Sequence, residues 1–185
     1  LNNTDVTEDG YETLYIGMDF NVQHMAAIVH VVRDGDPCAV AEFYDLYDTP
    51  AMIVAIEERY PDRGIVIYPD ASGKNRKTVD ALKNDIALLE QADFRISVNP
   101  SNPRVKSRVT AMNSMLCNAK GERRYLVNVE KCPNYSRGLE QQAYADNGEP
   151  DKTGGHDHAN DAGGYFIAMD YPVVRPMIAP AIRRY

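Results

Sequence analysis

The sequence has no apolar run approaching the roughly 20 consecutive residues that a membrane-spanning helix needs. Its N-terminus, LNNTDVTEDG, is polar and acidic, unlike a secretory signal peptide. The cysteines Cys38, Cys117 and Cys132 form no CxxC pair, so neither a disulfide framework nor a thiolate zinc site is indicated. We therefore expect a protein with no membrane partner, in which the cysteines are small buried apolar residues.

The sequence also has no excess of positive charge. Lys and Arg number 20 and Asp and Glu number 27, which gives a net charge of -7. This balance argues against a nonspecific nucleic-acid coat protein, because such a protein needs a basic surface. It leaves room for an enzyme with a local acidic site.

The patterns that are present predict one domain at 13–171, between a flexible N-terminal segment at 1–12 and a tail at 172–185. Thr49 and Pro50 are the predicted N-cap and N1 residues of the first helix. Apolar runs predict strands at 13–22, on both sides of a turn at 34–37 within 25–47, and at 64–70, 94–99 and 123–129. Helical spacing predicts helices at 51–60, 77–92, 104–119, 134–145 and 156–171. An antiparallel three-strand start followed by alternating helices and strands predicts an α/β fold with a mixed central sheet, the order of a ribonuclease H-like core.

Three carboxylates stand where this fold would bind a ligand. Asp19 ends the first strand and Asp70 the fourth, and strand ends are ligand sites in open α/β sheets. Asp161 shares a face of the last helix with Asp157 and His158. If the three carboxylates converge, their repulsion raises at least one pKa unless a hard divalent cation such as Mg²⁺ or Mn²⁺ offsets it. Two such ions about 3.5–4 Å apart can promote phosphodiester cleavage.

Plainer explanations exist for these residues. Strand-end Asp residues often belong to turns, and Asp157 can interact with the dipole of its own helix. His156 and His158 suggest zinc, but positions two apart on a helix point about 200° apart. Gly163 and Gly164 weaken a helix and therefore indicate that another backbone or a substrate strand packs closely there.

Basic residues form three clusters, for which DNA phosphate contacts and solvated surface faces are equally good explanations. The first cluster lies in SGKNRKT at 72–78, which fails as a phosphate-binding P-loop because Tyr68 and Asn75 replace the required Gly and Ser or Thr. An NTPase within this chain is therefore disfavoured. The clusters are Lys74, Arg76 and Lys77; Arg104, Lys106 and Arg108; and Lys120, Arg123, Arg124 and Lys131.

With these residues placed, the chain resembles the C-terminal nuclease domain of the large terminase subunit of tailed bacteriophages. The resemblance covers most of 13–171 and is carried by IGMDFN at 16–21, IYPDASG at 67–73 and DHANDA at 157–162. The last motif is similar to the family's DHxxDA and is the most specific. The segment from Asn99 to Asn113 is also similar. The chain departs from the family after Asp161: the family continues with a larger residue and an Arg-Tyr pair, whereas this chain has Ala162-Gly163-Gly164-Tyr165. The family's Arg therefore has no counterpart here, while the metal-site residues are retained.

The resemblance implies a ribonuclease H-like endonuclease that uses two ions, Mg²⁺ or Mn²⁺, to cut concatemeric viral DNA during genome packaging. It implies Asp19, Asp70 and Asp161 as the catalytic metal carboxylates, His158 as a ligand or supporting partner, and Asp157 as a weaker ligand candidate. No recognition element stands out, so we expect low sequence specificity.

The implied partners are double-stranded DNA, the ATPase motor domain of the same full-length protein, the portal and the small terminase subunit. The implied location is the host cytoplasm, with transient attachment to the viral procapsid. The start at Leu1 agrees with an excised domain. Two other hypotheses stay open: another ribonuclease H-like enzyme of resolvase or integrase type, and a noncatalytic docking domain of the packaging motor.

Overall fold

The computed structural model describes residues 2–21, 23–71, 79–146 and 148–173, with only the backbone described for 79–84. The elements follow the predicted order. They are β1 (Leu14–Asp19), β2 (Met25–Arg33), β3 (Asp36–Leu46), α1 (Thr49–Arg59), β4 (Ile65–Pro69), α2 (Val79–Gln91), β5 (Arg95–Ile96), α3 (Val105–Leu116), β6 (Leu126–Val127), α4 (Pro133–Gln141) and α5 (Asp157–Asp170).

One mixed sheet of six strands has the order β5-β4-β1-β2-β3-β6. Strands β1, β2 and β3 pair antiparallel, whereas β4 and β5 extend the sheet parallel to β1, and β6 lies parallel to β3. The β2–β3 turn places Asp34 and Gly35 at φ values of 53° and 86°, the conformation that the Asp-Gly pair predicts for a tight hairpin. The predicted α/β, ribonuclease H-like arrangement is confirmed.

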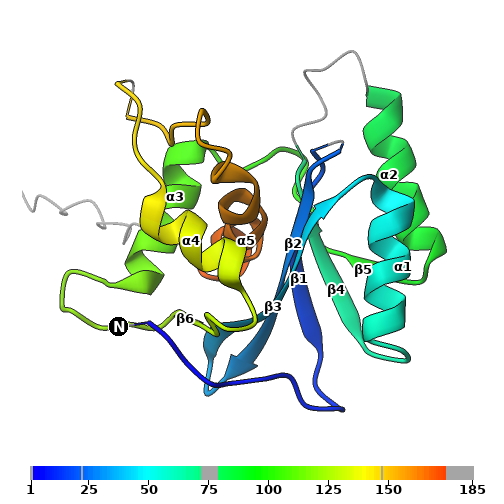
Figure 1. Ribbon diagram of the computed structural model, residues 1–185. Coiled ribbons are helices and arrows are strands. Elements are labelled where there is room, and N and C mark those ends of the chain that lie inside the picture. Colours follow the sequence, from blue (N-terminus) through cyan, green and yellow to red (C-terminus); the bar gives the residue numbers. More distant parts are fainter. Residues whose placement is uncertain (1, 22, 72–78, 147, 174–185) are drawn as a thin grey trace, which may run out of the picture.

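Helices cover both faces of the sheet. Helices α1 and α2 lie on one face, and α3, α4 and α5 lie on the other (Figure 1). Because neighbouring strand residues point to opposite faces, Ile16 and Met18 of β1 enter the apolar core under α1, whereas Tyr15 packs into the core under α5. Gly17 also faces α5, where a Cβ atom would collide with the carbonyl oxygen of Ala162. This glycine therefore lets α5 lie directly against β1.

Some element boundaries differ from the sequence predictions. The N-cap of α1 is Asp48 rather than Thr49, since the Asp48 carboxylate accepts a hydrogen bond from Ala51 N at 2.9 Å. The Thr49 hydroxyl instead donates to Asp85 at 2.9 Å. Strands β5 and β6 have two residues each, shorter than predicted, and are the outer strands of the sheet, with an isolated bridge from Asn3 to Val127 on the outer side of β6.

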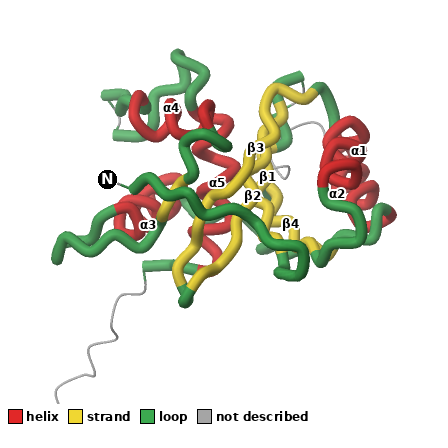
Figure 2. Tube along the Cα trace, turned by 60° about the horizontal axis from the view of Figure 1, so that its bottom comes forward, coloured by secondary structure: helices red, strands yellow, loops and turns green. Residues whose placement is uncertain are grey.

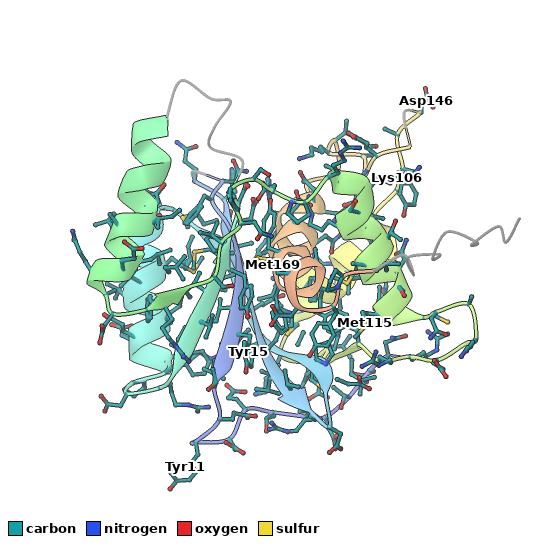
Figure 3. The ribbon with its side chains drawn as sticks, turned by 180° about the vertical axis from the view of Figure 1, so that it is seen from behind. Tyr11, Tyr15, Lys106, Met115, Asp146 and Met169 are labelled. Carbon is teal, nitrogen blue, oxygen red and sulfur yellow. The ribbon has the colours of Figure 1, made fainter. Side chains whose placement is uncertain are left out.

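The N-terminal segment contacts the domain at several points, which the sequence does not predict. Asn3 pairs with Val127 beside β6, and the Tyr60 hydroxyl donates to Glu8 at 2.9 Å. The segment passes below the strands in Figure 1 and crosses in front of them in Figure 2, and its fully exposed Tyr11 projects outward (Figure 3). The flexibility of 1–12 stays a prediction, and within the predicted tail residues 174–185 lie outside the described residues. No helix in the described part of the chain is long and apolar enough to cross a membrane.

Candidate active site

A cleft of about 600 Å³ lies where β1 and β4 end and α5 begins. Asp19 is the last residue of β1, and Asp70 directly follows β4. These two strands are parallel neighbours, so their ends meet at one edge of the sheet. The first turns of α5 add its acidic face. The cleft is therefore lined by all five predicted metal-site residues: Asp19, Asp70, Asp157, His158 and Asp161.

Asp19 is a buried carboxylate of the cleft. It is only 8% exposed, and burial raises its pKa. A hydrogen bond with His158 opposes this effect, while the negative charges of Asp161 and Asp70 raise the pKa further. The three carboxylates are thus close enough to repel one another, as the sequence predicts for a convergent acidic site.

His158 contacts Asp19 across the junction of α5 and β1. Its Nδ1 lies 3.2 Å from Asp19 Oδ2, and the Asn21 side-chain nitrogen lies 3.0 Å from its Nε2. The hydrogen bond with Asp19 raises the pKa of the imidazole against the effect of burial. The His24 ring is parallel to that of His158, with centroids 6.4 Å apart. The ring of His158 is therefore oriented toward the cleft.

Asp161 is paired with cations on both of its oxygens. Arg108 of α3 donates to Oδ1 at 2.6 Å, and the Lys152 ammonium lies 3.8 Å from Oδ2. Lys152 is also 3.6 Å from Asp157 Oδ2. The sequence analysis missed Lys152, because it stands in a loop without any recognisable motif. Tyr165 contributes a ring face under Arg108, with 4.7 Å between the guanidinium carbon and the ring centroid.

Asp70 has a partner that the sequence analysis also missed. The Asn102 amide donates to the Asp70 carboxylate, and its oxygen accepts from Ala71 N at 2.6 Å. Asn102 therefore links the segment before α3 to the end of β4. The sequence feature that could have identified Asn102 is its position inside the 99–113 segment, which resembles the terminase family.

The donor atoms in the cleft suit a hard divalent cation. Carboxylate oxygens and one imidazole come from three separate elements, and Mg²⁺ and Mn²⁺ prefer oxygen-rich sets. Among the residues that the structure describes, no three His, Cys, Asp or Glu side chains already surround a point at which one ion would fit. Asp161 is turned to Arg108 and Asp70 to Asn102. The residues fit such ions by chemistry and location.

The glycines of α5 are closely packed, as predicted, with side chains as their nearest neighbours. A Cβ atom on Gly163 would collide with the Tyr135 ring, and one on Gly164 would lie 3.0 Å from the Arg108 side chain. The nearest atoms are therefore side chains of α4 and α3, and the backbone of β1 also lies close, since a Cβ atom on Gly17 would be 3.6 Å from Gly163 Cα. His156 does not line the cleft; it is the N-cap residue of α5, outside the helix, so the predicted helical spacing of the two histidines does not apply.

The predicted DNA-binding residues are distributed over several places. Arg104 and Arg108 line the cleft, whereas Lys106 lies on the exposed end of α3 beside a separate small cavity (Figure 3). Arg124 pairs with Asp36 at the far end of the sheet, 2.7 Å away. Lys74, Arg76 and Lys77 lie outside the described residues. Of the predicted DNA-binding residues that the structure describes, Arg104 and Arg108 thus line the cleft and Lys106 does not.

Comparisons with known proteins are consistent with this arrangement. A family model described as the terminase RNaseH-like domain matches residues 16–170. The fold is similar to that of the large terminase of a thermophilic bacteriophage, with a TM-score of 0.67 and 19% identity over 91% of this chain and 42% of that chain. This chain therefore spans less than half the length of that relative.

Two solved nuclease domains are similar over most of their length. That of the bacteriophage SPP1 large terminase, solved with bound Mn, gives a TM-score of 0.59 and 19% identity over 90% of this chain and 93% of that chain. The large terminase nuclease of thermophilic phage G20c, solved with bound magnesium, gives a TM-score of 0.57 and 14% identity over 85% of this chain and 81% of that chain. No curated protein matches the chain.

Proposed function

Because the chain belongs to the family of terminase RNaseH-like domains, we propose that it is the nuclease that cuts viral DNA during genome packaging, with divalent cations as cofactors. The observation that carries this proposal is the convergence of carboxylates from β1, β4 and α5 in one cleft. The Mn-bound SPP1 domain and the magnesium-bound G20c domain support the choice of cofactor.

In this proposal Asp19, Asp70 and Asp161 hold two Mg²⁺ or Mn²⁺ ions, with His158 beside Asp19 and Asp157 as a weaker ligand. Such ions, when bound, activate a water molecule and polarise the scissile phosphate. The His158 ring keeps Asp19 oriented through the hydrogen bond between them. Asn102 does the same for Asp70.

DNA would lie across the mouth of the cleft. Arg104 there is exposed and able to contact a phosphate, and Lys106 extends the basic surface along α3. Lys74, Arg76 and Lys77 are proposed as further contacts. Phosphate contacts carry no sequence information, so cutting would have low sequence specificity.

The remaining partners belong to the full-length protein, and we propose them on family membership. They are an ATPase motor domain in the same chain, the portal and the small terminase subunit. The proposed site of action is the host cytoplasm, at the procapsid during packaging. Concatemeric double-stranded DNA is the proposed substrate.

The test is cutting of plasmid and linear duplex DNA by the purified chain in Mg²⁺ or Mn²⁺, beside a four-way junction. We expect cutting of both duplexes, its loss on chelation, and its loss in Asp161→Asn and Asp70→Asn with the fold retained. Preference for the junction would favour a resolvase-type enzyme. No Mn²⁺ binding up to millimolar concentration would favour a noncatalytic docking domain, and cutting by the purified Asn variants would contradict the assignment of the site.

A further inference from the structure

Arg108 has an environment unlike that of the other basic residues of α3. It is 6% exposed, donates to Asp161 Oδ1 at 2.6 Å, and covers the Tyr165 ring. Arg104, one turn earlier on the same helix, is exposed at the cleft. A guanidinium enclosed by a carboxylate and a ring offers little surface to a DNA backbone. Arg108 is therefore placed to act on Asp161 rather than on a phosphate.

Gly164 makes the space that Arg108 occupies. A Cβ atom at this position would lie 3.0 Å from both Cγ and Cδ of the arginine. Such contacts are tighter than nearly all real Cβ contacts, so with a side chain at 164 the arginine stem would have to shift by a few tenths of an ångström. The ion pair of Arg108 and Asp161 also separates the cleft from a second cavity of about 230 Å³, since both residues line both spaces.

The ion pair uses one oxygen of Asp161 and leaves the other toward the cleft. Oδ1 accepts from Arg108, whereas Oδ2 lies 3.8 Å from the ammonium of the exposed Lys152. We propose that Arg108 is a positioning residue that fixes the Asp161 carboxylate with Oδ2 available to a bound cation, and that Gly164 is required for this role. The inference rests on the proposed function, in which Asp161 is a metal carboxylate.

The first experiment compares Arg108→Met with Arg104→Met in DNA binding and cutting. A phosphate contact contributes about 0.9 to the slope of log affinity against log salt, so Arg104→Met is expected to lower the slope by about 1 and to raise KM. Arg108→Met is expected to keep the slope, measured in EDTA, and to lower kcat about 10- to 100-fold at saturating DNA. A lowered slope and raised KM with retained kcat would show that Arg108 is a phosphate contact and would overturn the proposal.

The second experiment measures Mn²⁺ binding without DNA, by the electron paramagnetic resonance signal of the free ion. Removing a positive charge beside a carboxylate would by itself strengthen cation binding. We nevertheless expect Arg108→Met to weaken Mn²⁺ binding about tenfold, because the carboxylate loses its orientation. Unchanged or stronger binding would overturn the positioning role.

Two further variants keep the test valid if Arg108→Met does not fold. Arg108→Lys retains the charge but cannot lie flat over Tyr165, so we expect partial recovery of kcat and Mn²⁺ affinity. Gly164→Ala should reproduce the loss with Arg108 present, and the double variant Arg108→Met/Gly164→Ala should be no worse than Arg108→Met. Normal kcat and Mn²⁺ affinity in Gly164→Ala would disprove its role. If wild type cuts no DNA, the proposed function fails, and the Mn²⁺ titration alone judges Arg108.

Discussion

The Asp19 carboxylate and the His158 imidazole meet across the junction of β1 and α5, with Nδ1 3.2 Å from Oδ2. Burial raises the pKa of this carboxyl, so the fold disfavours its charged form, and the negative charges of Asp161 and Asp70 add to the effect. A site that concentrates negative charge in this way costs stability. This loss of stability is consistent with a functional role for Asp19, because a neutral side chain at this position would give a more stable fold.

Asp19→Asn tests this cost directly. We expect loss of metal-dependent plasmid cutting with a free energy of unfolding that is equal to or higher than that of wild type, because the amide needs no charge in the buried position. Plasmid cutting and urea denaturation at pH 7 measure the two effects.

The matched control is Asp146→Asn, which makes the same charge change on an exposed loop (Figure 3). It is expected to leave both cutting and stability unchanged. An Asp19→Asn protein that is destabilised by several kcal/mol would mean that Asp19 is a structural residue.

Gly17→Ala tests the contact between β1 and α5. The added Cβ atom would collide with the carbonyl oxygen of Ala162, and backbone cannot move away as a flexible side chain can. We expect the free energy of unfolding to fall by about 1–3 kcal/mol. Cutting should fall too, because a displaced α5 carries His158 and Asp161 away from Asp19. Urea denaturation and plasmid cutting measure the two losses.

Gly64→Ala is the control for this substitution. Its Cβ atom would lie 3.7 Å from Thr13 Oγ1, an ordinary contact, so stability should be unchanged or higher by up to about 1 kcal/mol. Equal stability of Gly17→Ala and Gly64→Ala would show that β1 and α5 are less closely packed than described.

His30 gives the fold a dependence on pH that lies away from the cleft. Its fully buried ring has Nδ1 3.1 Å from the Tyr15 carbonyl oxygen, so Nδ1 carries the proton, and Nε2 accepts from the Tyr125 hydroxyl at 2.8 Å. Burial lowers its pKa to about 4, below the usual 6.5, against hydrogen bonds to the Tyr15 and Ile28 backbone. Protonation of Nε2 would turn it from an acceptor into a donor, so it could no longer accept the hydrogen bond from the Tyr125 hydroxyl.

The folded pKa lies below the unfolded value, so the stabilisation from a neutral His30 is complete above pH 6.5. It is lost as the pH falls toward 4 and amounts to roughly 3 kcal/mol at most. Asp19, Asp85 and Asp170, whose pKa values are raised mainly by burial, act in the opposite direction. We therefore expect His30→Gln to lose less stability than wild type between pH 7 and 4.5 in urea denaturation. Parallel curves for wild type and His30→Gln would contradict the prediction.

The sequence was sufficient to predict the order of the elements and the meeting of Asp19, Asp70 and Asp161 at one place, because apolar periodicity and short motifs are local properties. It was insufficient for the partners of those carboxylates. Arg108 is 53 residues from Asp161 in sequence, and Asn102 is 32 from Asp70. Such pairs depend on how α3 packs against α5 and β4. The same limitation explains the glycines: the sequence indicated close packing at Gly163 and Gly164, but only the structure identified the neighbours as Tyr135 and Arg108.

The net charge of -7 predicts weak, salt-sensitive DNA binding by the isolated chain. Part of the acid lies in the cleft, where two bound divalent ions would locally offset up to about four charges. Substituting Lys74, Arg76 and Lys77 together by Gln tests the basic segment that follows Asp70 in the sequence. We expect weaker duplex binding and a salt slope reduced by up to about 3, measured by fluorescence anisotropy at several salt concentrations.

The control replaces Arg123 and Arg124 by Gln at the opposite end of the sheet, where Arg124 pairs with Asp36. It removes two positive charges without touching the cleft edge, so the salt slope should stay as in wild type. Equal losses of duplex affinity and salt slope in both variants would mean that DNA binding depends only on the overall charge of the chain. Tight duplex binding by the wild-type chain without metal would contradict the electrostatic argument itself, because an acidic cleft without cations repels the DNA backbone.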